Sequence, residues 1–136
     1  MVFEALQRAG EPHGLTLFGT YAMNSLRMEK AYHAWGAELT NEVTLIAAEM
    51  ERFVDFGKDF IGKLGTLRAK QDGPPSKLVC LSVAATDHDC YGNEPVYHGD
   101  RIVGLTTGGA YGHAVNQSLA FAYVEAGLAQ ALDLRS

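Results

Sequence analysis

A break at residues 71–76, Gln-Asp-Gly-Pro-Pro-Ser, constrains the fold of this chain more than any other stretch. Proline fixes φ and has no backbone N–H, so Gly73-Pro74-Pro75 can continue neither a helix nor the hydrogen-bonded ladder of a sheet. Patterns compatible with helices precede this break, and the alternation typical of strands follows it. The sequence therefore predicts the α+β class, with a short N-terminal helical segment followed by a small antiparallel β-barrel.

The main predicted helix covers residues 20–35, which contain no Gly or Pro. Thr20 can cap its start and Gly36 can end it. Such a helix would place one stripe of large side chains on a single face, formed by Tyr21, Met28, Tyr32 and Trp35. Arg27 lies off this stripe, so it is available to a partner outside its own helix.

Two further helices are predicted, at residues 3–9 and 59–70, and an extended link joins the first to the main helix at residues 14–19. Periodicity does not separate helix from strand at residues 46–54. The segment before residue 20 is too short to bury both faces of its helix. We therefore expect the chain to begin inside a larger architecture.

Beyond the break the pattern has a period of two. The turn Gly99-Asp100 joins two short strands, because its glycine can adopt a positive φ. In the last strand large residues alternate with small ones, which suits the two faces of a small barrel. The predicted strands cover residues 77–83, 95–98, 101–107 and 118–124.

Composition excludes several classes of protein. The formal net charge of −5 argues against a surface that binds nucleic acid or a membrane, since such surfaces are basic. Two cysteines do not form a secreted disulfide scaffold, and no apolar run approaches the ~20 residues of a membrane span. We expect a cytoplasmic protein with neither a nucleic-acid nor a membrane partner.

Two stretches hold residue types that can carry chemistry. The glycine-rich residues 104–112 lack the Gly-Lys-Ser/Thr end of a phosphate-binding loop, so glycines that let strands bend are the better interpretation. The run Asp87-His88-Asp89-Cys90 offers metal-ligand types, but its spacing matches no zinc pattern. We assign neither a metal site nor a catalytic residue, and Cys80 is expected to be buried in its strand.

Four ordered segments carry a resemblance to a known family. They are Ala-Met-Asn-Ser-Leu-Arg-Met-Glu-Lys at 22–30 with Trp35-Gly36 and Glu38-Leu39 beyond it, Lys-Asp-Phe-Ile-Gly-Lys at 58–63, Gly-Asn-Glu-Pro-Val-Tyr at 92–97 and Gly-Leu-Thr-Thr-Gly-Gly-Ala-Tyr-Gly at 104–112. The chain thereby resembles the folate-dependent aminomethyltransferases: glycine-cleavage T-proteins and the folate-binding halves of dimethylglycine and sarcosine dehydrogenases. The dehydrogenase branch is the closer match, because T-proteins usually carry Ala-Arg-Asp at the start of the first segment.

The resemblance implies a division of the chain and a ligand. Residues 1–70 would be the tail of a folate-binding domain, and residues 75–136 the C-terminal barrel domain. Tetrahydrofolate would be the cofactor, in the one-carbon metabolism of glycine and methylamines. Its binding residues would be Arg27, Glu29, Tyr32 and Trp35, with Arg27 as the direct contact and Glu29 fixing local geometry.

A structural role for Arg27 stays open as the alternative. An Arg fork can pair with acceptor edges or the carboxylate of folate, and aromatic rings can cover its flat pteridine. Arg27 could instead pair with a buried carboxylate of this chain, such as Glu49 or Glu51. Such a pair would make it a residue of the fold.

The chain also departs from the family pattern. The family's catalytic Asp and its pterin-binding segment lie further upstream than this chain reaches, because 26 residues precede Arg27. We expect a protein that is not catalytically complete alone and that needs the missing folate domain or a complementary subunit. Its apolar residues at 1–36 would otherwise be covered in a homodimer. The alternative is a non-catalytic orphan barrel that acts as a binding or regulatory module.

The sequence leaves the substrate open. A glycine-derived aminomethyl group, dimethylglycine, sarcosine or another methyl donor would each be compatible with the resemblance.

Overall fold

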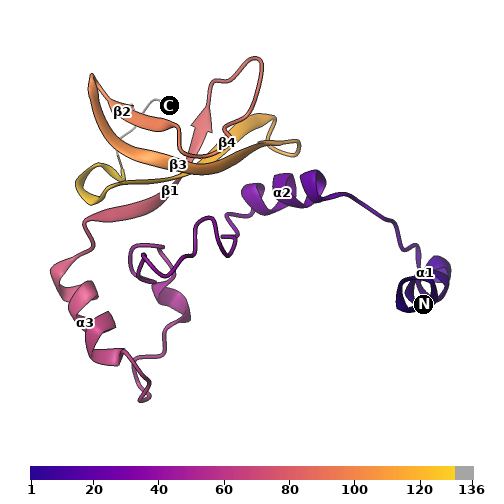
Figure 1. Ribbon diagram of the computed structural model, residues 1–136, viewed down its shortest axis with the longest axis horizontal. Coiled ribbons are helices and arrows are strands. Elements are labelled where there is room, and N and C mark those ends of the chain that lie inside the picture. The colour runs from indigo at the N-terminus through magenta and orange to yellow at the C-terminus, as the bar shows by residue number, and fades with distance from the viewer. Residues whose placement is uncertain (131–136) are drawn as a thin grey trace.

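The computed structural model describes residues 1–130, in which helices precede a four-stranded sheet (Figure 1). The predicted α+β class is confirmed. The last six residues of the predicted 75–136 domain lie outside the described residues. The elements are α1 (Val2–Gly10), η1 (Glu11–His13), α2 (Thr20–Glu29), η2 (Glu51–Phe53), α3 (Lys63–Asp72), β1 (Ser76–Val83), β2 (Pro95–His98), β3 (Arg101–Gly112), β4 (Gln117–Glu125) and η3 (Ala126–Leu128).

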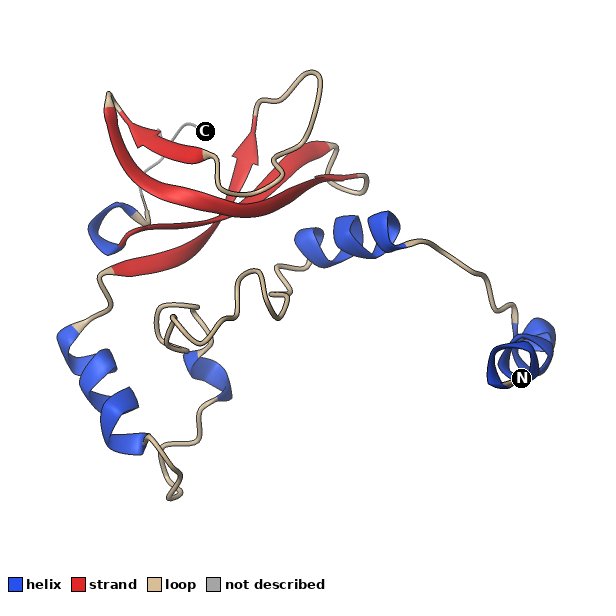
Figure 2. Ribbon diagram, viewed as in Figure 1, coloured by secondary structure: helices blue, strands red, loops and turns tan. Residues whose placement is uncertain are grey.

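All strand pairs of the sheet are antiparallel, in the order β1-β4-β3-β2 (Figure 2). The strand β2 has the predicted bounds, and Gly99 turns the chain into β3 with φ 63°. A bulge between Thr106 and Gly108 shifts the register of β3 against β4. The strand order places β4 and β3, the two longest strands, at the centre of the sheet.

The predicted alternation in β4 separates two apolar clusters. Phe121 packs with Met28 of α2 and Leu78 of β1 on one face of the sheet. Val124 packs with Val96 and others on the opposite face. Because successive side chains of a strand point to opposite faces, β4 contributes to both clusters. The full sets are Met28, Leu78, Ala110, Leu119 and Phe121, and Val96, Val103, Ala122 and Val124.

The glycines of β3 allow β4 to approach closely. A Cβ at Gly109 would lie 2.7 Å from the carbonyl oxygen of Leu119, and a Cβ at Gly104 would overlap the carbonyl oxygen of Tyr123. Real Cβ atoms do not come this near to backbone atoms of a neighbouring strand. These glycines thus serve the close packing of β3 on β4, whereas the sequence predicted that they let the strand bend.

The predicted helix over residues 20–35 is too long, because α2 ends at Glu29. Ala31 adopts a left-handed φ of 52°, and the N–H groups of Ala31 and Tyr32 donate to the carbonyls of Met28 and Arg27. These are the two hydrogen bonds of a Schellman motif, which stops a helix. Tyr32 and Trp35 therefore lie off the helix, and the predicted stripe does not exist.

Other local predictions also need correction. Residues 46–54 form turns and the short η2, and the N–H of Leu78 donates to the carbonyl of Ala47 at 2.9 Å along the edge of β1. The predicted helix at 59–70 begins at Lys63, because Gly62 adopts φ 89° immediately before it. Cys80 was expected to be buried and is exposed.

The segment before α2 extends away from the sheet (Figure 1). The predicted helix at residues 3–9 is confirmed as α1, and none of its residues is buried. Among residues 1–130, the structure contains no helix that is both long and apolar enough to cross a bilayer.

Candidate functional site

The helix α2 is held on β3 by polar side chains. Ser25 Oγ donates to the carbonyl oxygen of Tyr111 at 2.6 Å, and Asn24 Nδ2 donates to that of Gly109 at 3.1 Å. Glu29 Oε1 accepts the backbone N–H of Ala114 at 2.7 Å, just beyond the strand. These bonds occupy both ends of the contact, so the helix is fixed in register with β3.

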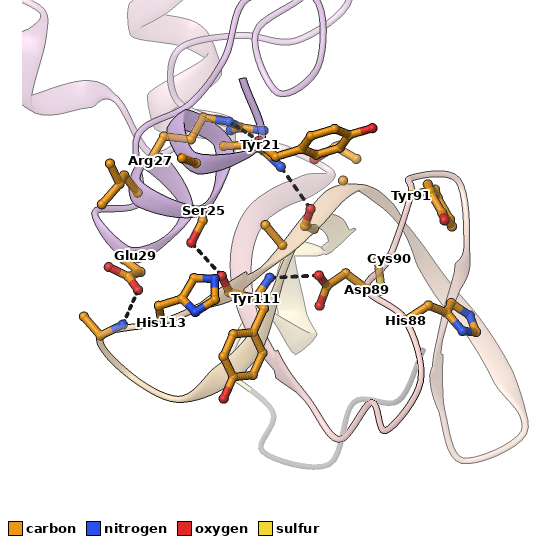
Figure 3. A pocket seen from close by; sticks show the side chains of 18 residues that line it. Tyr21, Ser25, Arg27, Glu29, His88, Asp89, Cys90, Tyr91, Tyr111 and His113 are labelled. Atoms are coloured by element: carbon orange, nitrogen blue, oxygen red, sulfur yellow. Dashed lines mark hydrogen bonds between the residues drawn. The ribbon is translucent and has the colours of Figure 1, made fainter. Parts of the chain in front are cut away.

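An open groove of about 970 Å³ runs between α2 and the sheet (Figure 3). The α2 side of the groove carries Tyr21, Arg27 and Glu29, and the opposing loop between β1 and β2 carries His88 and Tyr91. The ring of Tyr21 is almost fully exposed. The groove thus combines a cation, carboxylates and flat rings that a polar, planar ligand could contact.

Arg27 is engaged by three acceptors. Its Nε donates to Asn24 Oδ1 at 2.7 Å, and its Nη1 donates to the carbonyl oxygen of Tyr32 at 3.1 Å and to Glu38 Oε2 at 2.9 Å. The guanidinium also lies 5.7 Å from the centre of the Phe121 ring. No hydrogen bond of residues 1–130 uses Nη2, so two of the five donors on this side chain stay available.

The carboxylate of Glu38 is the centre of this network and is fully buried. It accepts hydrogen bonds from the N–H of Ala34 at 2.7 Å and from Thr107 Oγ1 at 2.8 Å, besides the pair with Arg27. A buried carboxylate is costly unless it is paired and hydrogen-bonded, and here both oxygens have partners. The network joins α2 and the loop after it to β3.

Tyr123 of β4 makes a further hydrogen bond to Glu38. Its hydroxyl donates to the backbone carbonyl oxygen of Glu38 at 2.8 Å. Burial, together with the Glu38 charge, raises the pKa of Tyr123 to about 12. The hydroxyl therefore keeps its proton, and this donation persists across the physiological pH range.

Acidic side chains also order the opposing wall of the groove. Asp89 accepts the N–H of Tyr111 at 2.9 Å and the hydroxyl of Ser118. Glu94 accepts the N–H groups of Tyr91 and Gly92 and the hydroxyl of Thr106. Burial alone would raise the pKa of Glu94, but the hydrogen bonds from Thr106 and the backbone lower it. These carboxylates fix the loop before β2 against β3.

The four predicted ligand residues fall in different places. Arg27 and Glu29 both line the groove. Tyr32 lines a second hollow of about 420 Å³ beside His33 and Phe121, and Trp35, with 78% of its surface exposed, lines neither. The structure therefore brings together only the first two.

The buried partner of Arg27 is not the one suggested by the sequence. Glu49 pairs with Lys77 and Glu51 pairs with Lys70, both at the surface. Glu38 takes the place that was expected for one of them, so Arg27 has the structural role that the sequence left open and also lines the groove. Sequence reasoning did not identify Glu38 as this partner. The spacing of 11 residues from Arg27 equals about three helical turns, but α2 ends at Glu29 and the chain between the two residues is not one helix, so no sequence period relates them.

Two family models match the chain, one on each side of the break at residues 71–76. Residues 1–58 match the GCVT N-terminal domain, and residues 77–134 match the glycine cleavage T-protein C-terminal barrel domain. Human mitochondrial dimethylglycine dehydrogenase is 43% identical over 131 residues, which cover 95% of this chain and 15% of that protein. The aminomethyltransferase of Aquifex aeolicus is 33% identical over 124 residues, which cover 91% of this chain and 33% of that enzyme.

One solved structure shows the same fold. The crystal structure of glycine cleavage system aminomethyltransferase T from Bartonella henselae matches with a TM-score of 0.70 and 23% identity, over 78% of this chain and 30% of that one. This chain thus spans from 15% to about a third of the length of the relatives that it matches.

Proposed function

The chain belongs to the aminomethyltransferase (glycine-cleavage T-protein) family, and we propose that it supplies part of a folate site in a dimethylglycine-dehydrogenase-like protein. Tetrahydrofolate, when bound, would accept a one-carbon unit on its N5 and N10 nitrogens. The part of this chain would be to bind and orient the folate, because the groove beside α2 holds the required donor and flat rings.

The proposal rests on the Nη2 group of Arg27. Its Nε and Nη1 are fixed by Asn24, Tyr32 and Glu38, while Nη2 has no partner among residues 1–130. Folate offers acceptor edges on its pteridine and carboxylates on its glutamate tail, and both groups suit a guanidinium fork. The residues present therefore fit the cofactor at one edge.

The other three predicted residues differ in their relation to the groove. Glu29 holds the turn after β3 through the N–H of Ala114, so it fixes local geometry. The exposed rings of Tyr32 and Trp35 lie outside the groove, on the loop that Glu38 fixes. The flat rings beside Arg27 in the groove are those of Tyr21, Tyr91 and Tyr111, and an aromatic ring can cover one face of a flat ligand.

The rest of the site would come from another chain segment. The N-terminal 36 residues leave large apolar side chains exposed, and such a surface usually has a partner. We propose that the remainder of a folate-binding domain, in a longer chain or a complementary subunit, covers it. In the isolated chain a second copy would cover the same face. The exposed residues include Phe3, Leu6, Leu15, Leu17, Phe18 and Tyr21.

The test is to titrate the purified 136-residue chain with a stable reduced folate, 5-formyltetrahydrofolate, and to follow ligand signals by NMR. A partial site should bind weakly, with a Kd on the order of 0.1–1 mM. Arg27→Met, at a temperature where circular dichroism shows it to be folded, should weaken binding by about tenfold or more. The chain alone should turn over neither dimethylglycine, sarcosine nor an aminomethyl donor.

Two results would contradict this function. One is the absence of folate binding by the wild-type chain, which would favour a binding or regulatory module without folate. The other is unchanged affinity in Arg27→Met, which would place the folate elsewhere.

A further inference from the structure

We propose that Glu38 is a positioning residue, which fixes the guanidinium of Arg27 so that Nη2 faces an acceptor or anionic group of the ligand. This inference rests on the proposed folate function and extends it to a residue that does not line the groove. Glu38 lies beneath Arg27 with its carboxylate fully buried. It would act on the ligand only through Arg27.

The carboxylate of Glu38 is a rigid anchor. One oxygen accepts the hydroxyl of Thr107 on β3, and the other accepts the N–H of Ala34 together with Arg27 Nη1. The hydroxyl of Tyr123 on β4 holds the backbone carbonyl of the same residue. Because two strands of the sheet fix Glu38, its carboxylate cannot follow a movement of the Arg27 side chain.

The orientation of Arg27 follows from this anchor. A guanidinium is planar, so donation from Nε to Asn24 and from Nη1 to Glu38 sets both its position and its plane. The side chain of Arg27 is 18% exposed, and Arg27 is one of the residues that line the groove. Nη2 is the part of its guanidinium that has no partner among residues 1–130. A fixed fork loses less entropy on binding a ligand than a mobile one does.

A surface pair of the same chemistry provides the control. Arg101 Nη1 contacts Glu125 Oε1, with 59% of the arginine side chain exposed. Neither residue has another hydrogen bond from its side chain among residues 1–130. An exposed pair of this kind leaves both side chains mobile. Glu125→Gln is therefore the matched variant for Glu38→Gln.

The first experiment needs no ligand. Arginine Nε–H signals of the ¹⁵N-labelled chain are recorded by NMR, and the Arg27 signal is assigned by its loss in Arg27→Met. We expect Arg27 Nε–H to exchange with water at least about tenfold more slowly than Arg101 Nε–H, as expected for a part-buried bonded group. Because Nε–H itself donates to Asn24, it reports Glu38 only through the orientation of the guanidinium. Glu38→Gln should therefore narrow this difference, and Glu125→Gln should leave it unchanged.

If Glu38→Gln does not fold, Thr107→Val gives a second measurement. It removes the hydrogen bond from the sheet to the Glu38 carboxylate but retains the charge pair with Arg27. Faster exchange at Arg27 Nε–H in this variant would still support an anchored carboxylate. Equal exchange at Arg27 and Arg101 in the wild-type chain would overturn the proposal, whatever the ligand does.

The second experiment separates positioning from stability. Affinity for 5-formyltetrahydrofolate is measured in the wild-type chain, Glu38→Gln, Arg27→Met and the double variant, at a temperature where all are folded. Glu38→Gln should weaken binding by about tenfold with Arg27 present and by less than about twofold with Met at position 27. Equal weakening in both backgrounds would mean that Glu38 does not act through Arg27, and would overturn the proposal.

The two proposals fail in distinguishable ways. A wild-type chain that binds no folate contradicts the proposed function, while the exchange measurement still decides whether Glu38 fixes Arg27. A chain that binds folate through Arg27, with exchange unaffected by Glu38→Gln, keeps the function and overturns the positioning role.

Discussion

Two helices of nearly equal length behave differently in this molecule. The helix α1 has 9 residues and buries none of them, whereas α2 has 10 residues and buries Ser25 and Met28. Isolated helices shorter than about 12–15 residues are marginal in water, so neither is stable by its own hydrogen bonds. What distinguishes α2 is its partner, since its side chains bond to β3 and Met28 enters the apolar cluster of the sheet.

An amphipathic pattern therefore specifies the apolar face of a helix but not the element that covers this face. The apolar residues Phe3 and Leu6 share one side of α1, as Met28 and Ser25 share one side of α2. Only the second pair meets a strand. The buried pair of Arg27 and Glu38 extends that contact into the loop after α2, so the stable unit begins at α2 and not at α1.

The largest effect is expected for Arg27→Met, which removes the charged partner of a buried carboxylate. Breaking such a pair should lower the free energy of unfolding by about 3–5 kcal/mol, because Glu38 would stay buried without its countercharge. The measurement is urea unfolding followed by circular dichroism. Arg101→Met is the control. Loss of its exposed pair with Glu125 should lower the free energy of unfolding by about 0–1 kcal/mol. Equal losses in the two variants would contradict a structural role for the Arg27 pair.

A smaller loss is expected inside the sheet, from Gly104→Ala. The new Cβ would collide with the carbonyl of Tyr123 on β4, and forced overpacking costs about 1–3 kcal/mol. Gly65→Ala is the matched change in α3, where a Cβ meets nothing within 4 Å. It should stabilise the chain by about 0.5–1 kcal/mol, because alanine favours a helix interior over glycine. Thermal melts that shift in the same direction for both variants would refute this account of β3.

The sequence predicted the sheet better than the helical half. The alternation of apolar and polar residues in a strand and the turn at Gly99 are set by residues adjacent in the sequence. The predicted bounds of β2 are therefore confirmed. The end of α2 depends on Ala31, whose left-handed φ no propensity favours, and on the contacts that hold the following loop. For the candidate site, Arg27 was identified by resemblance, but its partner Glu38 was not, because the pair forms only in the folded chain.

Ala31→Gly should have a modest effect of the opposite sign. Ala31 is held at φ 52°, where glycine has no steric penalty, so the change should stabilise the chain by about 0.5–1 kcal/mol. The change would stabilise the end of α2 and leave α1 unchanged. Chemical denaturation of the variant beside the wild type measures it, and a loss of stability would mean that the Schellman turn is not strained.

The smallest effect on folding is expected in α1. Phe3→Ser combined with Leu6→Ser changes two exposed residues, so the free energy of unfolding should change by less than about 0.5 kcal/mol. The same variant should weaken self-association, if a second copy covers this face. Sedimentation of both proteins at tens of micromolar, on the order of weak dimer constants, tests this. A wild-type chain that sediments as a monomer, or a variant that associates equally, would contradict the homodimer.

Amide hydrogen exchange of the dilute wild-type chain compares the two regions in one measurement. Amides of α1 should exchange at nearly the rate of an unfolded chain, while those of β4 should be protected up to the global stability. The backbone N–H of Ala34, which donates to the buried Glu38 carboxylate, should be protected like the sheet. Amides of α1 that exchange as slowly as those of β4, or an Ala34 amide that exchanges as fast as those of α1, would contradict a stable unit that begins at α2 and is anchored by Glu38.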